Sequence, residues 1–100
     1  MMLNDLTFNC TCEACPEQYD VYDSDNERIA YIRLRHGFLT CECTICNKQL
    51  YAEDLSNLGI SGIFGYKWRD RYLHKLAEII VYHNNKERTF KWLHKVICLY

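Results

Sequence analysis

The strongest constraint on this chain is a cysteine pattern that occurs twice, once near the N-terminus and once near the middle. Residues 10–15 read Cys-Thr-Cys-Glu-Ala-Cys and residues 41–46 read Cys-Glu-Cys-Thr-Ile-Cys, so the spacing Cys-x-Cys-x-x-Cys is repeated. Two Cys-x-x-Cys units can supply the four thiolates of a tetrahedral zinc site. The repeat therefore predicts a structural Zn²⁺ bound by four cysteines: Cys12, Cys15, Cys43 and Cys46.

The short length of the chain, 100 residues, explains why a metal site would help it to fold. A chain of this size forms one domain, and its small core offsets the chain entropy only narrowly. The composition, 49% hydrophobic and 25% charged, is typical of a folded protein rather than a disordered one. We therefore expect a single domain over residues 1–100.

The cysteine count and the N-terminal residues bear on the compartment. Seven is an odd number, which does not suit a framework of paired disulfides. The first residues show no basic region followed by an apolar stretch, and no apolar run reaches the roughly 18 residues of a membrane span. We expect a cytoplasmic protein without a membrane partner, because thiols stay reduced there and can bind metal.

Cys10 and Cys41 are left over when four cysteines bind one ion. Free cysteine behaves as a small hydrophobic residue, so one interpretation makes them buried thiols near the site. Alternatively, all six cysteines hold two metal ions, or one of these two replaces another ligand. An iron–sulfur cluster also accepts thiolates, but neither run has a ferredoxin spacing.

Around the two clusters, residues 10–52 resemble zinc ribbon proteins, in which Cys-x-x-Cys knuckles lie at the ends of β-hairpins. The resemblance implies the same four cysteine ligands and an antiparallel β region. The sequence departs from that pattern after each knuckle, where Pro16 and Asn47 replace the usual glycine.

Alternating β patterns lie between and after the clusters. Residues 18–23 and 29–36 alternate in polarity with a period of two, and an acidic loop separates them, so a β-hairpin is predicted. A turn containing glycine leads into a further strand at residues 38–43, and residues 49–53 can add a fourth. The predicted zinc-bearing β region spans about residues 10–53.

After the β region the apolar period becomes helical, which predicts a helix over about residues 66–83. The stripe consists of residues three or four positions apart, Trp68, Tyr72, Leu76, Ile79 and His83, and is widened by the residues beside them, Leu73, Ala77 and Ile80. Asn84 and Asn85 are predicted to end this helix, and a basic amphipathic helix follows to residue 100. The predicted fold class is α+β, a small zinc-ribbon-like antiparallel β region packed against one long helix plus a C-terminal helix.

Charge divides the chain into two halves of opposite sign. Residues 1–58 carry ten acidic and four basic side chains, and residues 59–100 carry three and eight, giving −6 and +5. Such a division favours either docking of the halves on each other or an anionic partner for the basic half. The candidate partner-binding cations are all in the helical half: Arg69, Arg71, Lys75, Arg88, Lys91 and Lys95.

A second resemblance covers about residues 15–80. The stretch from Tyr31 to Phe38, reading Tyr-Ile-Arg-Leu-Arg-His-Gly-Phe, and the following glycine-containing loop and helix are similar to small uncharacterised bacteriophage proteins. The resemblance implies a viral origin, a location in the host cytoplasm and a host-directed binding role. It implies no enzymatic activity.

Two functions follow from these patterns. The first is a non-enzymatic, zinc-stabilised protein-interaction module, such as a phage-encoded inhibitor or adaptor of a host complex, because aromatic side chains and arginines are typical of interface hot spots. The alternative is a zinc ribbon that binds nucleic acid through its basic helices. A homodimer through the last helix is compatible with both. No zinc deaminase or metalloprotease motif occurs, so we do not expect an enzyme.

Overall fold

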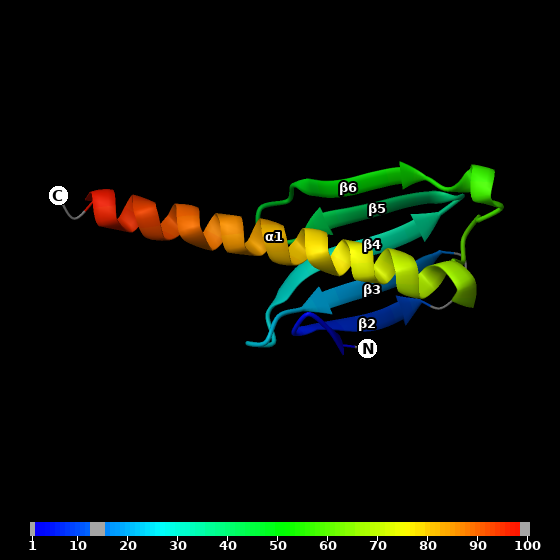
Figure 1. The fold of residues 1–100 in the computed structure, drawn as a ribbon, viewed down its shortest axis with the longest axis horizontal. Coiled ribbons are helices and arrows are strands. Elements are labelled where there is room, and N and C mark those ends of the chain that lie inside the picture. Colours follow the sequence, from blue (N-terminus) through cyan, green and yellow to red (C-terminus); the bar gives the residue numbers. More distant parts are fainter. Residues whose placement is uncertain (1, 13–15, 99–100) are drawn as a thin grey trace.

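The fold is a six-stranded antiparallel sheet with one long helix across one face (Figure 1). The computed structural model of the chain covers residues 2–12 and 16–98, and the side chains of residue 66 and of residues 87–98 are not described. The elements are β1 (Met2–Leu3), β2 (Leu6–Cys12), β3 (Glu17–Tyr22), β4 (Arg28–Arg35), β5 (Phe38–Cys43), β6 (Gln49–Asp54), the 3-10 turn η1 (Ser56–Leu58) and α1 (Tyr66–Cys98). This arrangement confirms the predicted α+β class.

The strands follow one another across the sheet in chain order, and each pairs antiparallel with the next. The four predicted strands are confirmed as β3 to β6, with ends that agree within two residues. The sequence prediction missed β1 and β2. Within β2, buried Leu6 and Phe8 alternate with exposed Thr7 and Asn9, but two apolar positions are a weak strand signal beside a cysteine cluster.

The core lies between α1 and the sheet face that it covers. Alternate residues of β4 point into this core, and Ala30, Ile32 and Leu34 are fully buried as the period-two pattern predicted. The helix buries the stripe that the helical period predicted, with these members in the core: Tyr72, Leu73, Leu76, Ala77 and Ile80. The opposite sheet face has no described element packed on it (Figure 1).

A single helix replaces the two helices that were predicted. The helix α1 runs without interruption from Tyr66 to Cys98, through Asn84 and Asn85. An asparagine inside a helix costs only about 0.7 kcal/mol or less, and no glycine or proline occurs within these 33 residues. Asparagine can end a helix, but here nothing requires the chain to turn.

The turn between β4 and β5 contains two residues with left-handed backbone conformations. His36 has a φ of +52° and Gly37 a φ of +79°. The Gly37 carbonyl accepts a hydrogen bond from the Leu55 N–H, so this turn is packed against the segment that leads to α1. A Cβ on Gly37 would lie 2.8 Å from the Ile60 carbonyl oxygen, a contact with backbone that cannot be relieved by a side-chain rotation.

We expect the Gly37→Ala substitution to lower the free energy of unfolding by about 2–3 kcal/mol, since it adds this clash to the cost of a positive φ. Gly59→Ala is the matched control, because Gly59 has a φ of +77° and no atom within 4 Å of an added Cβ. Urea unfolding should show a loss of only about 1 kcal/mol for the control. Equal losses for the two variants would contradict the close packing at Gly37.

Candidate metal centre

The turn between β5 and β6 folds the second Cys-x-x-Cys unit into a compact knuckle. The Cys43 N–H donates a hydrogen bond to the Lys48 carbonyl at 2.8 Å, which closes the turn. Thr44 donates two further hydrogen bonds to carbonyl groups at the start of β4. The Cys46 N–H donates a hydrogen bond to the Cys43 sulfur at 3.5 Å, which links the two cysteines of the knuckle. Asn47 adopts a φ of +60°, which asparagine tolerates, and so takes the place of the expected glycine.

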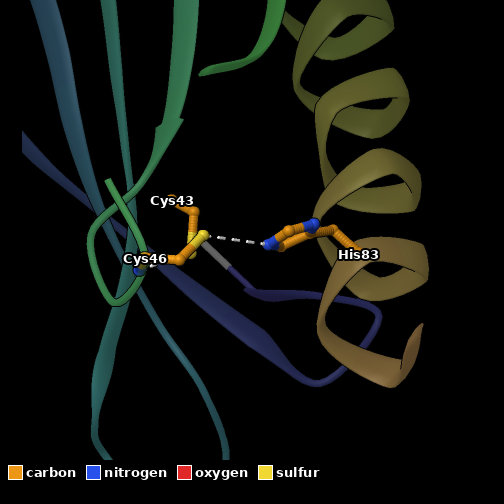
Figure 2. A group of neighbouring side chains, drawn as sticks. All are labelled: Cys43, Cys46 and His83. Carbon is orange, nitrogen blue, oxygen red and sulfur yellow. Dashed lines mark hydrogen bonds between the residues drawn. The ribbon is translucent and has the colours of Figure 1, made fainter. Parts of the chain in front are cut away.

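His83 of α1 faces this knuckle (Figure 2). Its Nε2 atom lies 3.5 Å from Sγ of Cys46. The ligand atoms of Cys43, Cys46 and His83 all lie within 4.8 Å of one another. Cys43 is buried, His83 is half-buried and Cys46 is exposed, so the three side chains lie where the interior meets solvent. Among the residues whose side chains the structure describes, no other group of His, Cys, Asp and Glu has this geometry.

The donor set and its spacing fit a transition-metal ion. Thiolate and imidazole are ligands that zinc prefers, and its bonds to them are about 2.3 and 2.0–2.1 Å long. Tetrahedral geometry then places ligand atoms about 3.5–3.8 Å apart. The sulfur–nitrogen distance of 3.5 Å meets this condition without rearrangement. Three protein ligands leave the fourth position for water or for a further ligand.

Cys12, which the sequence predicts as a ligand, does not belong to this group. Across the sheet, Cys12 of β2 pairs with Gln18 of β3, Gln18 pairs with Arg33 of β4, and Arg33 pairs with Thr40 of β5. Cys12 is therefore level with Thr40. Cys43 lies three residues further along β5, and β5 is three strands away from β2. With about 4.8 Å between strands and 3.4 Å per residue, the two Cα atoms are about 18 Å apart. One zinc ion cannot bridge that distance.

The remaining predicted ligands have other surroundings or fall outside the described residues. Cys41 is fully buried in the core, and burial raises the pKa of its thiol to about 12. Cys10 lies beside the Glu17–Arg69 pair and lines a hollow of about 330 Å³ there. Neither residue is part of the three-ligand group. The fourth predicted ligand, Cys15, lies outside the described residues.

His83 was not identified as a ligand from the sequence, although a signal was present. The helical stripe places His83 on the face of α1 that points to the sheet, where a half-buried imidazole needs a polar partner. What the sequence does not show is that His83 lies beside the Cys43 end of β5, whereas the start of the helix, at Arg69, lies near the Cys10 end of β2. The position of His83 relative to the two cysteine clusters depends on the sheet register and on the path of the helix.

Arg69, a predicted partner-binding residue, is instead part of a buried ion pair. Its Nε and Nη2 atoms each donate to a carboxylate oxygen of Glu17 at 2.9 Å, and Glu17 is only 1% exposed. The Phe64 N–H and the Tyr19 hydroxyl also donate to this carboxylate. Burial acts to raise the pKa of Glu17, but the hydrogen bonds and the charge of Arg69 outweigh it and hold the pKa below the usual 4.5.

Two other predicted cations also interact within the molecule. Lys75 donates to the Tyr51 hydroxyl at 2.8 Å and lies 3.9 Å from the Glu53 carboxylate. Arg71 lies over the ring of Trp68. The pairs that Arg69 and Lys75 form with acidic residues join the basic and acidic halves, which agrees with docking of the halves on each other. The side chains of three predicted cations lie outside the described residues: Arg88, Lys91 and Lys95.

Comparisons of the chain with protein-family models, with curated proteins and with solved structures find no match. Over the part of the chain that the structure describes, no helix combines the length and the apolar character needed to cross a membrane.

Proposed function

We propose that this chain is a non-enzymatic protein-interaction module in which one structural Zn²⁺ holds a long helix against a β-sheet. The observation that carries the proposal is that the group formed by Cys43, Cys46 and His83 joins the β5–β6 turn to α1. The helix continues for 15 residues beyond His83 and projects past the edge of the sheet (Figure 1), so the molecule measures 55 × 23 × 18 Å. The candidate ligands are close to the point where the helix leaves the sheet.

A metal ion at this point would act as a cross-link between distant parts of the chain. Cys46 and His83 are 37 residues apart in sequence, and each belongs to a different layer of the fold. Because the three ligands are brought together only by folding, zinc binding would add its free energy to that of folding. The ion would thereby limit the bending of α1 relative to the sheet.

The projecting part of the helix supplies the proposed binding element. Its sequence places apolar residues three or four positions apart, which is the pattern of a helix face that packs on another protein: Phe90, Leu93 and Ile97. The backbone of α1 is helical through these positions. The resemblance to small phage proteins favours a host protein as the partner. A second copy of this chain is the alternative partner.

The experiment compares the intact protein with the Leu93→Asp and Ile97→Asp double variant. We expect purified protein to retain a defined partner from host lysate, and the double variant to lose it by at least about tenfold, because charges disrupt an apolar helix contact. Analytical ultracentrifugation tells a second copy from a host partner. Capture and self-association that are both unchanged in the variant would contradict the proposal.

Nucleic-acid binding by the basic side of α1 is less well supported. Arg69 and Lys75 already interact with the carboxylates of Glu17 and Glu53, and an ion-paired cation is less available to a phosphate group. The arrangement therefore favours the protein-interaction role for this helix.

A further inference from the structure

The sheet face opposite α1 has a basic hollow at its β4–β5 turn. Its volume is about 390 Å³, and five residues line it: Arg33, Arg35, His36, Phe38 and Thr40. The strand register explains this grouping, since Arg33 pairs with Thr40 and Arg35 with Phe38. The four side chains therefore lie in two adjacent rows on the same face of two neighbouring strands.

The two arginines in this hollow are available to a ligand. Among the residues that the structure describes, the ion pairs involve Arg28, Arg69 and Lys75, and neither Arg33 nor Arg35 takes part in one. Placing two guanidinium groups close together without a counter-ion is unfavourable, and a bound anion would relieve that repulsion. Guanidinium groups bind phosphate oxygens in a bidentate manner, so a phosphate group is the anion that suits them.

Phe38 adds an aromatic surface to the same hollow. Its side chain is 48% exposed, which is unusual for a phenylalanine in a sheet, and it lies in the row of Arg35. A flat apolar ring next to two cations suits a ligand that joins an aromatic ring to a phosphate. Arg35 and His36 also line a second hollow of about 290 Å³, where the adjoining part of such a ligand could lie.

One neighbouring acidic side chain, that of Asp54, is engaged elsewhere. Asp54 pairs with Phe38 in the sheet register. Its carboxylate accepts a hydrogen bond from the Ser56 N–H at 3.0 Å, at the start of the 3-10 turn. Asp54 therefore has a structural partner of its own and does not neutralise the arginines through an ion pair of the described residues.

We propose that the hollow formed by Arg33, Arg35 and Phe38 binds a nucleotide, with its phosphate on the two arginines and its base on the phenylalanine ring. The nucleotide is either free or part of a single-stranded nucleic acid, because both present this chemistry. The proposal does not depend on the metal group, which involves other residues at the opposite end of β5.

The test measures binding of two probes, adenosine 5′-monophosphate and a single-stranded oligothymidylate, by calorimetry. We expect Arg33→Gln combined with Arg35→Gln to weaken binding at least tenfold. For the oligonucleotide, loss of two phosphate contacts should reduce the salt-dependence slope by about 1.4. Phe38→Ala should weaken binding about fivefold or more through loss of stacking.

The matched control removes the same two charges from the helix. Lys67 and Arg71 are exposed and lie near the Trp68 ring, and their double replacement by glutamine should change affinity less than twofold. Binding of both probes supports a free nucleotide as ligand, and binding of the oligonucleotide alone supports a nucleic acid. The proposal is overturned if neither probe binds, if the arginine variant binds as the wild type does, or if Phe38→Ala has no effect.

Discussion

Replacing His83 with alanine is expected to lower the Zn²⁺ affinity of this protein by at least about 100-fold. The substitution removes one of the three candidate ligands, and even the loss of a residue that only orients a metal ligand typically reduces affinity about 10–100-fold. Competition with a chromophoric chelator measures the affinity directly. Metal binding at a site that forms only on folding also stabilises the fold. In the presence of zinc, the melting temperature of His83→Ala should therefore be lower than that of the wild type. A chelator should lower the melting temperature of the wild-type protein.

Two control variants make this prediction specific. His74 lies on the exposed side of the same helix and is hydrogen-bonded to the Asp70 carbonyl, so His74→Ala should leave zinc affinity unchanged. Cys12→Ser should also retain zinc, because Cys12 lies at the far end of the sheet, whereas Cys43→Ser should lose it. Loss of zinc in Cys12→Ser but not in His83→Ala would support the four-cysteine site and contradict binding by Cys43, Cys46 and His83.

Replacing Arg69 with methionine is expected to lower the free energy of unfolding by about 2–3 kcal/mol. The change leaves the carboxylate of Glu17 buried without its cation, and breaking a buried pair from one side typically costs about 3–5 kcal/mol. We expect the smaller loss of about 2–3 kcal/mol because the Arg69 side chain is 34% exposed and water partly screens the pair. Urea unfolding near neutral pH measures the loss.

The pH dependence of stability gives this prediction a second readout. The pKa of Glu17 is lower in the folded protein than its usual 4.5, so the unfolded chain binds the proton more tightly. The Glu17–Arg69 pair therefore makes its full contribution to the free energy of unfolding above about pH 4.5. This contribution is lost as the pH falls through the pKa of Glu17 in the folded protein. In Arg69→Met this part of the acid sensitivity should be smaller, since the pKa of Glu17 is no longer held down.

An exposed ion pair on the same sheet provides the control. The Nη2 atom of Arg28 lies 2.8 Å from Oδ1 of Asp20, and the two side chains are 45% and 21% exposed. Arg28→Met should reduce stability by about 1 kcal/mol or less, because water and salt screen such pairs. If Arg28→Met and Arg69→Met were equally destabilising, the burial of Glu17 would not have the importance assigned to it.

Local patterns predicted most of the fold because they report directly on which side of an element is buried. Ala30, Ile32 and Leu34 alternate with polar residues, and the structure confirms the strand and its buried face. The patterns were less informative where a residue tolerates two states. Asn84 can end a helix or continue one, and the structure shows continuation.

The candidate metal group was predicted only in part for a related reason. Cys43 and Cys46 are three residues apart, so a short turn alone brings them together and the sequence predicts them as a pair. Cys12 has the same local spacing to Cys15, but spacing within one cluster says nothing about the distance between clusters. Strand order and register determine that distance.

By itself, then, the amino-acid sequence determined the class of the fold, the helix stripe and the Cys43–Cys46 half of the candidate metal centre, because each depends on residues within a few positions of one another. Only the tertiary structure decided that His83 approaches these cysteines, that Cys12 does not, and that buried Glu17 pairs with Arg69. These contacts join residues that are far apart in sequence, and they form only when the helix packs across the assembled sheet.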